Sequence, residues 1–574
     1  MSDRRIGVYI CHCGGNISDY VDVEQVRAAV EREPGVVVAK TAMFTCSDAT
    51  QQEMVSDIQE QNLDGLVVAS CSPKLHLFTF RDMARRAGLN PYQYTQVNIR
   101  EQCSWAHGHD HQGATEKAIR LVRAGIARTA LTEPLMPVKI ETVPRVLVIG
   151  AGVAGLRAAL GLADLGIAVL LVERSPEAGG WTGRFGKTYP SGKNGREMIA
   201  RLVQEVKQRE NITFYTGAEL VEKSGSIGNF TVKIRISRGD DITANVGSII
   251  VATGFEPYHP DEGEYGYGMD GVLTLPEFKE AVDGAGDGLF YKGREVKDVV
   301  YIYCVGSRQR PEQGRGHTYC SRYCCNAAVH ASLLAGEKSP RLHQYHLFRD
   351  MRTYGRFELL YQQAREKGSI FLKFDENEPP ALEKLPDGRL KVTIKDFLTA
   401  GEEISIITDL VVLVTGMTPR HNNQLTDILK LPVGKDGFYN EIHPKLRPVE
   451  TVVDGVFICG TCQGPKNAAE SVASALAAVT QCASILKKGY VELEPQMAFV
   501  QTDLCTWCGQ CARACPYEAI EKGQDEGREV ARVNEALCKG CGGCAPECPR
   551  GAINLKGYTS AQIMAMIDAL AKEI

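Results

Sequence analysis

The sequence predicts an α/β protein built on parallel sheets and closed by a small cysteine-rich domain. Short apolar runs alternate with amphipathic stretches over residues 1–110 and again beyond residue 145, as in parallel strands joined by helices. A glycine-rich turn joins a strand to a helix after residue 145, and two similar cysteine runs lie near the end. We therefore expect an N-terminal α/β domain, a linker helix with a connector, a central α/β domain and a C-terminal domain, over residues 1–112, 113–144, 145–495 and 496–574.

The composition is that of an ordinary globular protein. The 574 residues are 44% hydrophobic and 24% charged, and 65 basic against 70 acidic residues give a net charge of -5, which argues against a nucleic-acid-binding protein. No signal peptide is visible, and Arg157, Asp164 and Glu173 interrupt the longest apolar stretches, so we expect no membrane span. Twenty cysteines without a secretory signal favour metal ligation in a reducing compartment, and we expect a cytoplasmic protein.

Residues 145–174 have the pattern of a dinucleotide site. An apolar strand (Arg145–Ile149) leads through a GxGxxG turn into a helix, and the next strand ends at Glu173. Such glycines allow a tight turn, a close approach of the backbone to a pyrophosphate and close helix–strand packing. The helix N-terminus offers N–H groups to the pyrophosphate, and the acidic residue suits a ribose. The alternative is a turn that binds nothing; the candidate binding residues are Gly150, Gly152, Ala154, Gly155, Glu173 and Arg174.

Cysteines follow each of the four strands expected within residues 1–110. Because ligands of open α/β sheets gather outside the carboxyl ends of the strands, these thiols can converge and hold a [4Fe–4S] cluster. The alternative is a set of inert buried thiols, since free cysteine behaves as a small hydrophobic residue. Five candidates exist for four positions, so Cys11 or Cys13 is expected to be spare. The candidate ligands are Cys11, Cys13, Cys46, Cys71 and Cys103.

The segment after the first domain predicts a helix and an extended connector. An amphipathic pattern covers Thr115–Thr129. Pro134, Pro137 and Pro144 follow, and prolines at this spacing favour an extended chain. We place the domain boundary there.

Three further motifs in the central domain suit a flat or phosphorylated ligand. A glycine pair precedes Trp181, an Ala-Thr-Gly triplet closes a strand at residue 254, and Gly460 follows a late strand that leads into a helix. This order resembles the two-dinucleotide-domain flavoprotein family that includes thioredoxin reductase. The resemblance implies an FAD lined by Gly180, Trp181, Thr182, Ala252, Thr253, Gly254, Gly460, Thr461, Asn467 and Ala468.

A second cysteine set stands where that family holds its nicotinamide nucleotide. The strand Val299–Tyr303 runs into Cys304-Val305-Gly306-Ser307-Arg308, which is not a GxGxxG turn. Adjacent cysteines point to opposite sides of an extended chain, but a turn can direct both toward one cluster. We therefore expect a second [4Fe–4S] site; the alternative is a thiol pair that cycles as a disulfide. The candidate ligands are Cys304, Cys320, Cys324 and Cys325.

Three further cysteines lie in the late part of the central domain. Cys459 and Cys462 form a CxxC, which suits a redox dithiol when exposed. We favour the alternative that Cys459 is a small residue packed under the flavin. Cys482 lies in an alanine-rich helix and is expected in the core.

The C-terminal domain predicts a ferredoxin with two [4Fe–4S] clusters. A C-x₂-C-x₂-C-x₃-C-P run occurs twice, and in such runs the fourth cysteine ligates the other cluster. Zinc also accepts four thiolates, but the doubled run with its prolines argues against it. The last helix, Ser560–Lys572, is expected to be a packing surface. One cluster is expected to use Cys505, Cys508, Cys511 and Cys548, and the other Cys538, Cys541, Cys544 and Cys515.

Together these motifs resemble the A-type subunits of heterodisulfide reductase, a family of iron–sulfur flavoproteins. The resemblance is carried by VYICHCGGNI, VVASCSPKLH, NIREQCSW, VLVIGAGVAGL, YCVGSR, YCSRYCC and GVFICGTCQGPKNAAESVASA, and it spans nearly the whole chain. It implies FAD and four [4Fe–4S] clusters in all. It further implies B- and C-type partner subunits, a hydrogenase or formate dehydrogenase module, ferredoxin as an acceptor and a homodimeric core. Some members of the family carry out flavin-based electron bifurcation.

Two departures limit what the resemblance implies. Many relatives carry an additional ferredoxin module in the flavin domain, whereas residues 229–253 hold no cysteine. Relatives thought to bifurcate often have a lysine shortly after the paired cysteines, where this chain has His330. Histidine is charged only part of the time near neutral pH. We therefore treat His330 either as a flavin-tuning residue or as a plain helix residue, and no catalytic residue is assigned.

The sequence thus predicts an electron-distributing oxidoreductase subunit. Its FAD would exchange two electrons with a donor and its clusters one each. An NAD(P)H-dependent disulfide or ferredoxin reductase would need a second nucleotide motif, and a plain polyferredoxin would not need the flavin motifs. The flavin subunit of a quinone-interacting complex is the third alternative. We rank it lower because that relative lacks the N-terminal domain.

Overall fold

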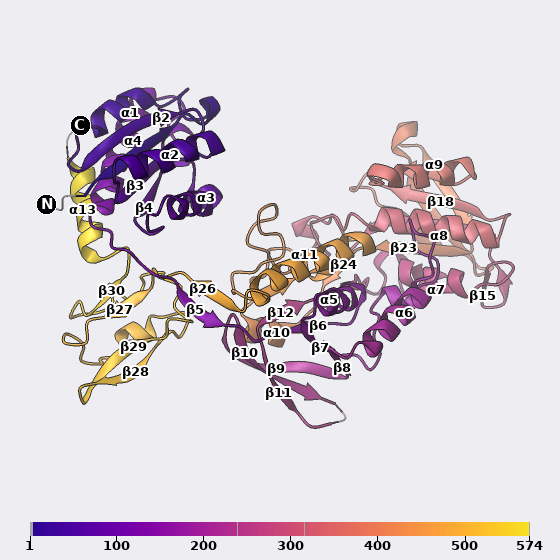
Figure 1. Ribbon diagram of the computed structural model, residues 1–574. Helices are drawn as coiled ribbons and strands as arrows, with labels where there is room; N and C mark the ends of the chain where they lie inside the picture. The colour runs from indigo at the N-terminus through magenta and orange to yellow at the C-terminus, as the bar shows by residue number, and fades with distance from the viewer. Residues whose placement is uncertain (1–3, 238, 315, 573–574) are drawn as a thin grey trace. The chain divides into compact units, whose positions relative to one another are not determined.

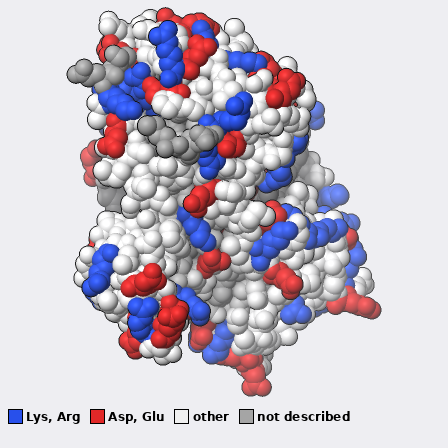
Figure 2. Space-filling view, turned by 60° about the vertical axis from the view of Figure 1, so that its left-hand side comes forward, with Lys and Arg blue, Asp and Glu red and all other residues white. Residues whose placement is uncertain are grey.

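The computed structural model describes residues 4–237, 239–314 and 316–572. It divides into two compact units, one formed by the chain up to Ile140 together with the chain from Glu492, the other by Glu141–Val491. Acidic and basic side chains are interspersed on the face shown in Figure 2, as expected from their near balance. The α/β class with parallel sheets is confirmed in both units.

The first unit contains a four-stranded parallel sheet in the order β2-β1-β3-β4. Alternate side chains of each strand face opposite sides, so two separate cores form, one beneath α1 and α4 and the other beneath α2 and α3. Figure 1 shows these helices on the sheet in indigo. The elements are β1 (Ile6–Cys11), α1 (Val23–Val30), β2 (Val36–Ala42), α2 (Asp48–Glu60), β3 (Gly65–Ser70), α3 (Pro73–Arg86), β4 (Tyr94–Asn98) and α4 (His111–Thr129).

Helix α4, which we expected in the connector, belongs to the core of the first unit. Asp110 caps its first turn by accepting from Gly113, and Ala118, Ile119 and Val122 are buried against the sheet. The C-terminal segment packs on the same helix. Helix α13 lies against α4, where Gln562 donates to the Leu131 carbonyl at 2.8 Å.

The C-terminal segment adds two short antiparallel pairs, β27 with β30 and β28 with β29. Cysteines lie in the turns between these strands, around a small core that includes Ile520 and Ile553. Residue Gly509 takes φ 74, which lets the chain turn into α12 between two cysteines. The elements are β27 (Ala498–Val500), α12 (Gln510–Arg513), β28 (Ile520–Asp525), β29 (Arg528–Val533), β30 (Ile553–Leu555) and α13 (Ser560–Ala571).

The second unit begins with a five-stranded parallel sheet in the order β25-β12-β6-β7-β8. Helices α5 and α11 pack on each other against it, and α6 covers its β7–β8 side. A three-stranded antiparallel sheet, β9 to β11, follows β8. The elements are β6 (Arg145–Ile149), α5 (Val153–Asp164), β7 (Ala168–Glu173), α6 (Gly195–Gln208), β8 (Ile212–Thr216), β9 (Ala218–Ser226), β10 (Asn229–Ile236), β11 (Ile242–Val246), β12 (Ser248–Val251), β25 (Val456–Ile458) and α11 (Ala468–Leu486).

A second parallel sheet in the same unit has the order β14-β23-β17-β18-β19 and its own antiparallel sheet, β20 to β22. Strands β13 and β24 pair where the chain passes between the two halves. The elements are β13 (Phe255–Pro257), β14 (Val272–Thr274), α7 (Leu275–Gly284), β17 (Asp298–Val305), α8 (Cys324–Lys338), β18 (His343–Phe348), α9 (Glu358–Glu366), β19 (Ile370–Lys373), β20 (Ala381–Lys384), β21 (Leu390–Lys395), β22 (Glu403–Thr408), β23 (Leu410–Thr415), β24 (Met417–Pro419) and α10 (Asn423–Leu429).

Within the described residues, α11 is long and apolar enough to cross a membrane by length and composition, with a mean hydropathy of 1.3. One side of this helix, with Ala475, Ala478 and Val479, is buried in the core shared with α5. We therefore interpret α11 as a core helix of the second unit.

Candidate functional site

The three glycines of the turn after β6 occupy three different environments. Gly150 takes φ 103, and a Cβ there would lie 2.5 Å from the Ala252 carbonyl oxygen. A Cβ on Gly155 would lie 1.8 Å from the Gly150 carbonyl oxygen, so a side chain there would displace backbone. A Cβ on Gly152 would meet no protein atom within 4 Å. Gly150 and Gly155 therefore shape the turn, and Gly152 leaves room for a ligand.

Glu173, at the end of β7, is held next to this turn. Its carboxylate accepts from the backbone N–H groups of Ala151 at 2.7 Å and Ser175 at 2.9 Å. A carboxylate has about four lone-pair sites, so both oxygens can still accept a hydroxyl donor. Glu173 therefore fixes the glycine turn and remains available to a ribose.

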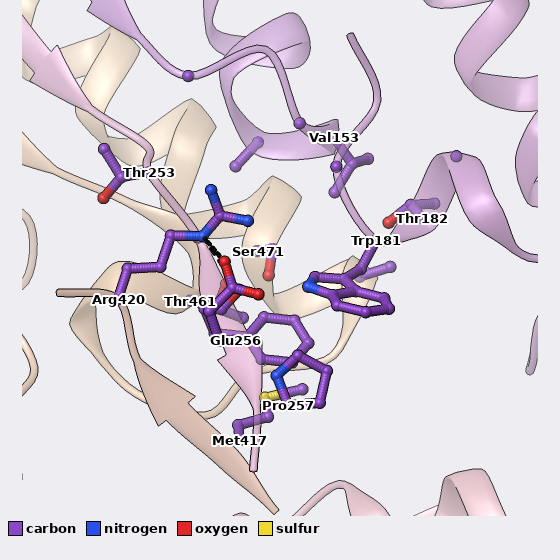
Figure 3. A pocket seen from close by; sticks show the side chains of 18 of the residues that line it. Val153, Trp181, Thr182, Thr253, Glu256, Pro257, Met417, Arg420, Thr461 and Ser471 are labelled. Carbon is purple, nitrogen blue, oxygen red and sulfur yellow. Dashed lines mark hydrogen bonds and ion pairs between the residues drawn. The ribbon is translucent and has the colours of Figure 1, made fainter. Parts of the chain in front are cut away.

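A cavity of about 750 Å³ opens at the glycine turn and extends to the second sheet. Figure 3 shows Val153, Trp181 and Thr461 around it, with Arg420 paired to Glu256 at 2.9 Å. Two predicted residues support the wall without lining it: Gly155 beneath the turn and Gly460, where a Cβ would lie 2.9 Å from that of Ala154. The other predicted residues line the cavity: Gly150, Gly152, Ala154, Glu173, Arg174, Gly180, Trp181, Thr182, Ala252, Thr253, Gly254, Thr461, Asn467 and Ala468.

The cavity wall carries buried polar atoms that lack a hydrogen-bond partner. These atoms are Thr253 Oγ1, Asn326 Oδ1 and Thr415 Oγ1. A buried polar group without a partner costs roughly 1–3 kcal/mol, so such groups usually meet a ligand or water. These features together fit a dinucleotide with a flat ring system: the unpartnered polar atoms, the space beside Gly152 and the aromatic ring of Trp181.

The second half of the unit contributes cavity residues that the sequence did not single out. Lys279 of α7 forms an ion pair with Asp283, and both side chains are nearly buried. Burial lowers the pKa of Lys279 despite that partner. Their i,i+4 spacing on a helix was the available signal, but only the fold places Lys279 in the cavity wall.

His330 of α8 also lines the cavity, beside the ring of Tyr189 at 5.7 Å. Burial, reinforced by the neighbouring charges of Lys279 and Lys187, lowers its pKa to about 4. The imidazole is therefore neutral at neutral pH, unlike a lysine at the same place.

The four cysteines expected beside the flavin converge at the carboxyl end of β17. The turn after β17 is joined to the Cys320 segment by backbone bonds from Arg308 N–H to the Tyr319 carbonyl and from His317 N–H to the Gly306 carbonyl. The thiol of Cys324 lies close enough to Cys325, Cys304 and Cys320 for each to raise its pKa. The fold therefore brings Cys304, Cys320, Cys324 and Cys325 together, and we refer to them as the quartet.

Backbone conformation at this quartet is strained. Cys304, Arg308 and Arg322 have positive φ angles of 64°, 58° and 54°, although none of them is glycine. Left-handed non-glycine residues cost roughly 1–3 kcal/mol and cluster at functional sites, where the surrounding structure imposes them. Three such residues around four thiols favour a bound group over a packed core.

Four of the five N-terminal cysteines share one sheet edge. Burial raises the pKa of Cys46, and the thiols of Cys11 and Cys13 raise it further. Burial raises the pKa of Cys71 to about 11, with Arg100 opposing and Cys13 and Cys11 adding to the shift. Cys103 is fully buried in the core beneath α4, and the charged group that acts on its pKa is Lys117. Cys103 shares that core with Cys11, and the expectation that Cys11 or Cys13 is the spare thiol stays a prediction.

The ferredoxin cysteines surround two small hollows, each with the set expected from cross-ligation. One hollow is lined by Cys505, Cys508, Cys511 and Cys548, and the other by Cys515, Cys538, Cys541 and Cys544. Backbone N–H groups already donate to these sulfurs, such as Ala531 to Cys505 at 3.2 Å and Ala552 to Cys548 at 3.2 Å. Hydrogen bonds of this kind stabilise cluster thiolates.

The remaining cysteines are core residues. Cys459 and Cys482 are fully buried, and the Cys462 thiol lies 3.3 Å from the Val251 carbonyl oxygen. Burial raises the pKa of Cys462 to about 11, which disfavours a reactive dithiol. Over the residues that the structure describes, no three His, Cys, Asp or Glu side chains are grouped as for a single metal ion.

Fold and site together define an iron–sulfur flavoprotein oxidoreductase. A family model described as pyridine nucleotide-disulphide oxidoreductase matches residues 144–286, and one described as 4Fe-4S dicluster domain matches residues 498–555. These matches confirm the FAD-type domain and the ferredoxin-type domain that the sequence predicts.

Full-length relatives identify the family. The chain is 36% identical to an A-type iron–sulfur subunit of the CoB–CoM heterodisulfide reductase of Methanopyrus kandleri, over 100% of this chain and 98% of the relative. It is 38% identical to the A-type subunit of the H2:CoB-CoM heterodisulfide,ferredoxin reductase of Methanothermobacter thermautotrophicus over the same shares. It is 32% identical to the A-type subunit of the H2/formate:CoB-CoM heterodisulfide,ferredoxin reductase of Methanococcus maripaludis, over 99% of each chain. The chain belongs to the family of heterodisulfide reductase A-type subunits.

The alignment to the Methanopyrus kandleri relative spans 659 positions, more than the 574 residues of this chain. The relative therefore carries insertions that this chain lacks. This difference agrees with the absence of cysteines from residues 229–253 in the flavin domain.

Proposed function

We propose that this chain distributes electrons from a two-electron donor through FAD to one-electron iron–sulfur carriers. FAD supplies exchange of both one and two electrons when bound. The chain itself holds the dinucleotide at the glycine turn, surrounds the ring with Trp181 and the second sheet, and keeps thiols on both units ready for clusters.

One observation carries the proposal: the first two turns of one helix contribute side chains to two sites. Helix α8 begins with Cys324 and Cys325, which belong to the quartet. The next residues of the helix include three that line the cavity: Asn326, Ala327 and His330. A cluster at the quartet would therefore lie within one helical turn of the ligand in the cavity. Short separation through packed protein is the arrangement that electron transfer requires.

The structure also supports this function over an NAD(P)H-dependent reductase. In the second sheet, the turn after β17 runs through Gly306, and a Cβ there would lie 2.1 Å from the ring of Tyr258. That ring covers the place where a glycine turn would approach a pyrophosphate. Cys304 of the quartet lies at the end of the same strand, shortly before Gly306 and its neighbours.

The four clusters are proposed as follows. Two are held by the ferredoxin sets, one by the quartet, and one at the N-terminal sheet edge by Cys11, Cys13, Cys46 and Cys71. Thiols must lose their protons to ligate iron. Burial raises the pKa values of Cys71 and Cys304, so the free energy of cluster assembly would have to drive their deprotonation.

The finer proposal is electron bifurcation within a larger complex. The name of the Methanothermobacter relative gives that protein two acceptors, a heterodisulfide and ferredoxin, and the Methanococcus name adds formate as a donor. We propose the same kinds of partner here: B- and C-type subunits, a hydrogenase or formate dehydrogenase module, and ferredoxin, around a homodimeric core. Delivery of equal numbers of electrons to ferredoxin and to the two-electron acceptor heterodisulfide by the native complex would support it, and reduction of one alone would contradict it.

The proposal is tested on the anaerobically purified chain. We expect about sixteen irons per FAD, as four cubane clusters require. We also expect NADH and NADPH to leave the flavin absorption unchanged. Far fewer irons, or bleaching by either nucleotide, would overturn the proposal.

A further inference from the structure

Arg308 lies in the turn that carries Cys304. Its guanidinium lies beside the Cys304 thiol, and one of its terminal nitrogens is buried without a hydrogen-bond partner. Its Nη2 donates to Asp350 at 2.7 Å, whereas Nη1 is buried without a hydrogen bond. A buried guanidinium N–H without an acceptor is costly, because its full desolvation penalty is uncompensated. The orphaned donor therefore indicates an acceptor that belongs at this place.

The surroundings hold Arg308 in a single position. Arg349, nearly buried, donates to the carbonyl oxygens of Ser307 and Arg308 at 2.9 and 3.1 Å, and the Arg308 N–H donates to the Tyr319 carbonyl. The positive φ of Arg308 is thus imposed from several sides. Burial opposes the charge on Arg308, but the bond to Asp350 and the nearby thiol of Cys304 outweigh it and raise its pKa.

We propose that Arg308 is a positioning residue that donates from Nη1 to the sulfur shell of the cluster held by the Cys304 quartet and raises its reduction potential. This inference rests on the proposed function, which places a cluster there. A cluster with four thiolates is an anion and becomes more negative on reduction. A cation that donates to its sulfurs therefore stabilises the reduced form more than the oxidised form.

The test is a redox titration of the whole chain, followed by electron paramagnetic resonance of the flavin-side cluster. Arg308→Gln is expected to disfavour reduction about tenfold, which lowers the one-electron potential by about 59 mV. Arg308→Lys keeps the charge but loses the planar guanidinium with its several N–H donors. We therefore expect a smaller lowering of the reduction potential. Arg356→Gln removes an exposed charge from the same unit and is expected to leave the potential unchanged.

Iron and flavin contents separate this inference from the proposed function. If Arg308→Gln keeps wild-type iron and its potential is unchanged, the inference is wrong and the cluster assignment stands. If the wild-type chain lacks a cluster at the quartet, the proposed function fails first. If Arg308→Gln loses that cluster while Arg308→Lys keeps it, the test uses Arg308→Lys. An unchanged reduction potential of its quartet cluster contradicts the inference, and a lowered potential supports it.

Discussion

Cys325 and Asn326 are consecutive residues in the first turn of α8, yet they serve different sites. The Cys325 thiol interacts with Cys324 in the quartet, whereas Asn326 lines the dinucleotide cavity with its Oδ1 buried and unpartnered. A helix directs neighbouring side chains about 100° apart, so one short turn can separate two ligands while keeping them close.

The glycine turn provides a matched pair of variants. Gly155→Ala places a methyl group 1.8 Å from backbone and is expected to destabilise the chain by about 1–3 kcal/mol. Gly152→Ala meets no protein atom within 4 Å and sits on extended backbone, so the melting temperature should stay the same. Its methyl group enters the ligand space, and we expect FAD affinity to fall about tenfold. Equal FAD affinity in Gly152→Ala and wild type would show that the pyrophosphate does not approach this residue.

The N-terminal cysteines give a second comparison. Cys71→Ser should remove the cluster proposed at the N-terminal sheet edge, with a loss of about four irons per chain. Cys103→Ala should keep all the iron if Cys103 is the spare thiol, because its pKa responds to Lys117, although it shares a core with Cys11. Iron analysis of both purified variants makes the check. Iron loss from Cys103→Ala with retention in Cys71→Ser would reverse the assignment.

Cross-ligation in the ferredoxin domain predicts which pairs of cysteine variants lose more iron together than either variant loses alone. Cys515 shares its hollow with Cys541, and Cys508 lies in the other hollow. The double variant Cys515→Ala with Cys541→Ala should lose no more iron than Cys541→Ala alone. The double variant Cys515→Ala with Cys508→Ala should lose both clusters, since independent sites add. The reverse pattern would mean that each cysteine run binds its own cluster.

The low pKa of His330 makes a pH prediction. With a pKa of about 4, the imidazole is neutral throughout pH 6–8, so exchange for a neutral side chain changes no charge there. The difference in flavin potential between wild type and His330→Gln should therefore be the same at pH 6 and pH 8. A difference that grows toward pH 6 would show a histidine with its ordinary pKa of about 6.5.

The lowered pKa of His330 also makes the stability of the folded chain depend on pH. Since the folded pKa lies below that of an unfolded histidine, the unfolded chain binds more protons between about pH 6.5 and pH 4. The contribution of His330 to stability is therefore present above this window and is lost as the pH falls through it. His330→Gln should flatten that part of the acid unfolding curve.

Most of the features that could be predicted from the sequence depend on local residue patterns. The strand–glycine–helix turn, the doubled ferredoxin run and the bounds of α13 depend on residues close together in the chain. The structure has them within a few residues of the expected positions. The convergence of Cys304 with Cys320 also follows from topology, since both flank one strand end.

What the sequence missed depends on packing between distant segments. Lys279 enters the cavity wall only because α7 packs beside α8, and Tyr258 covers Gly306 only because β13 pairs with β24. Helix α4 has the pattern of any amphipathic helix, so nothing local assigns it to the N-terminal core instead of the connector.

The central claim is that a cluster lies beside the flavin at the quartet. The most direct measurement compares iron and flavin per chain in the wild type and in a variant with Cys304, Cys320, Cys324 and Cys325 all changed to alanine, both purified without oxygen. We expect the variant to lose about four irons and to keep its FAD. Unchanged iron content in a folded, flavin-containing variant would contradict the account.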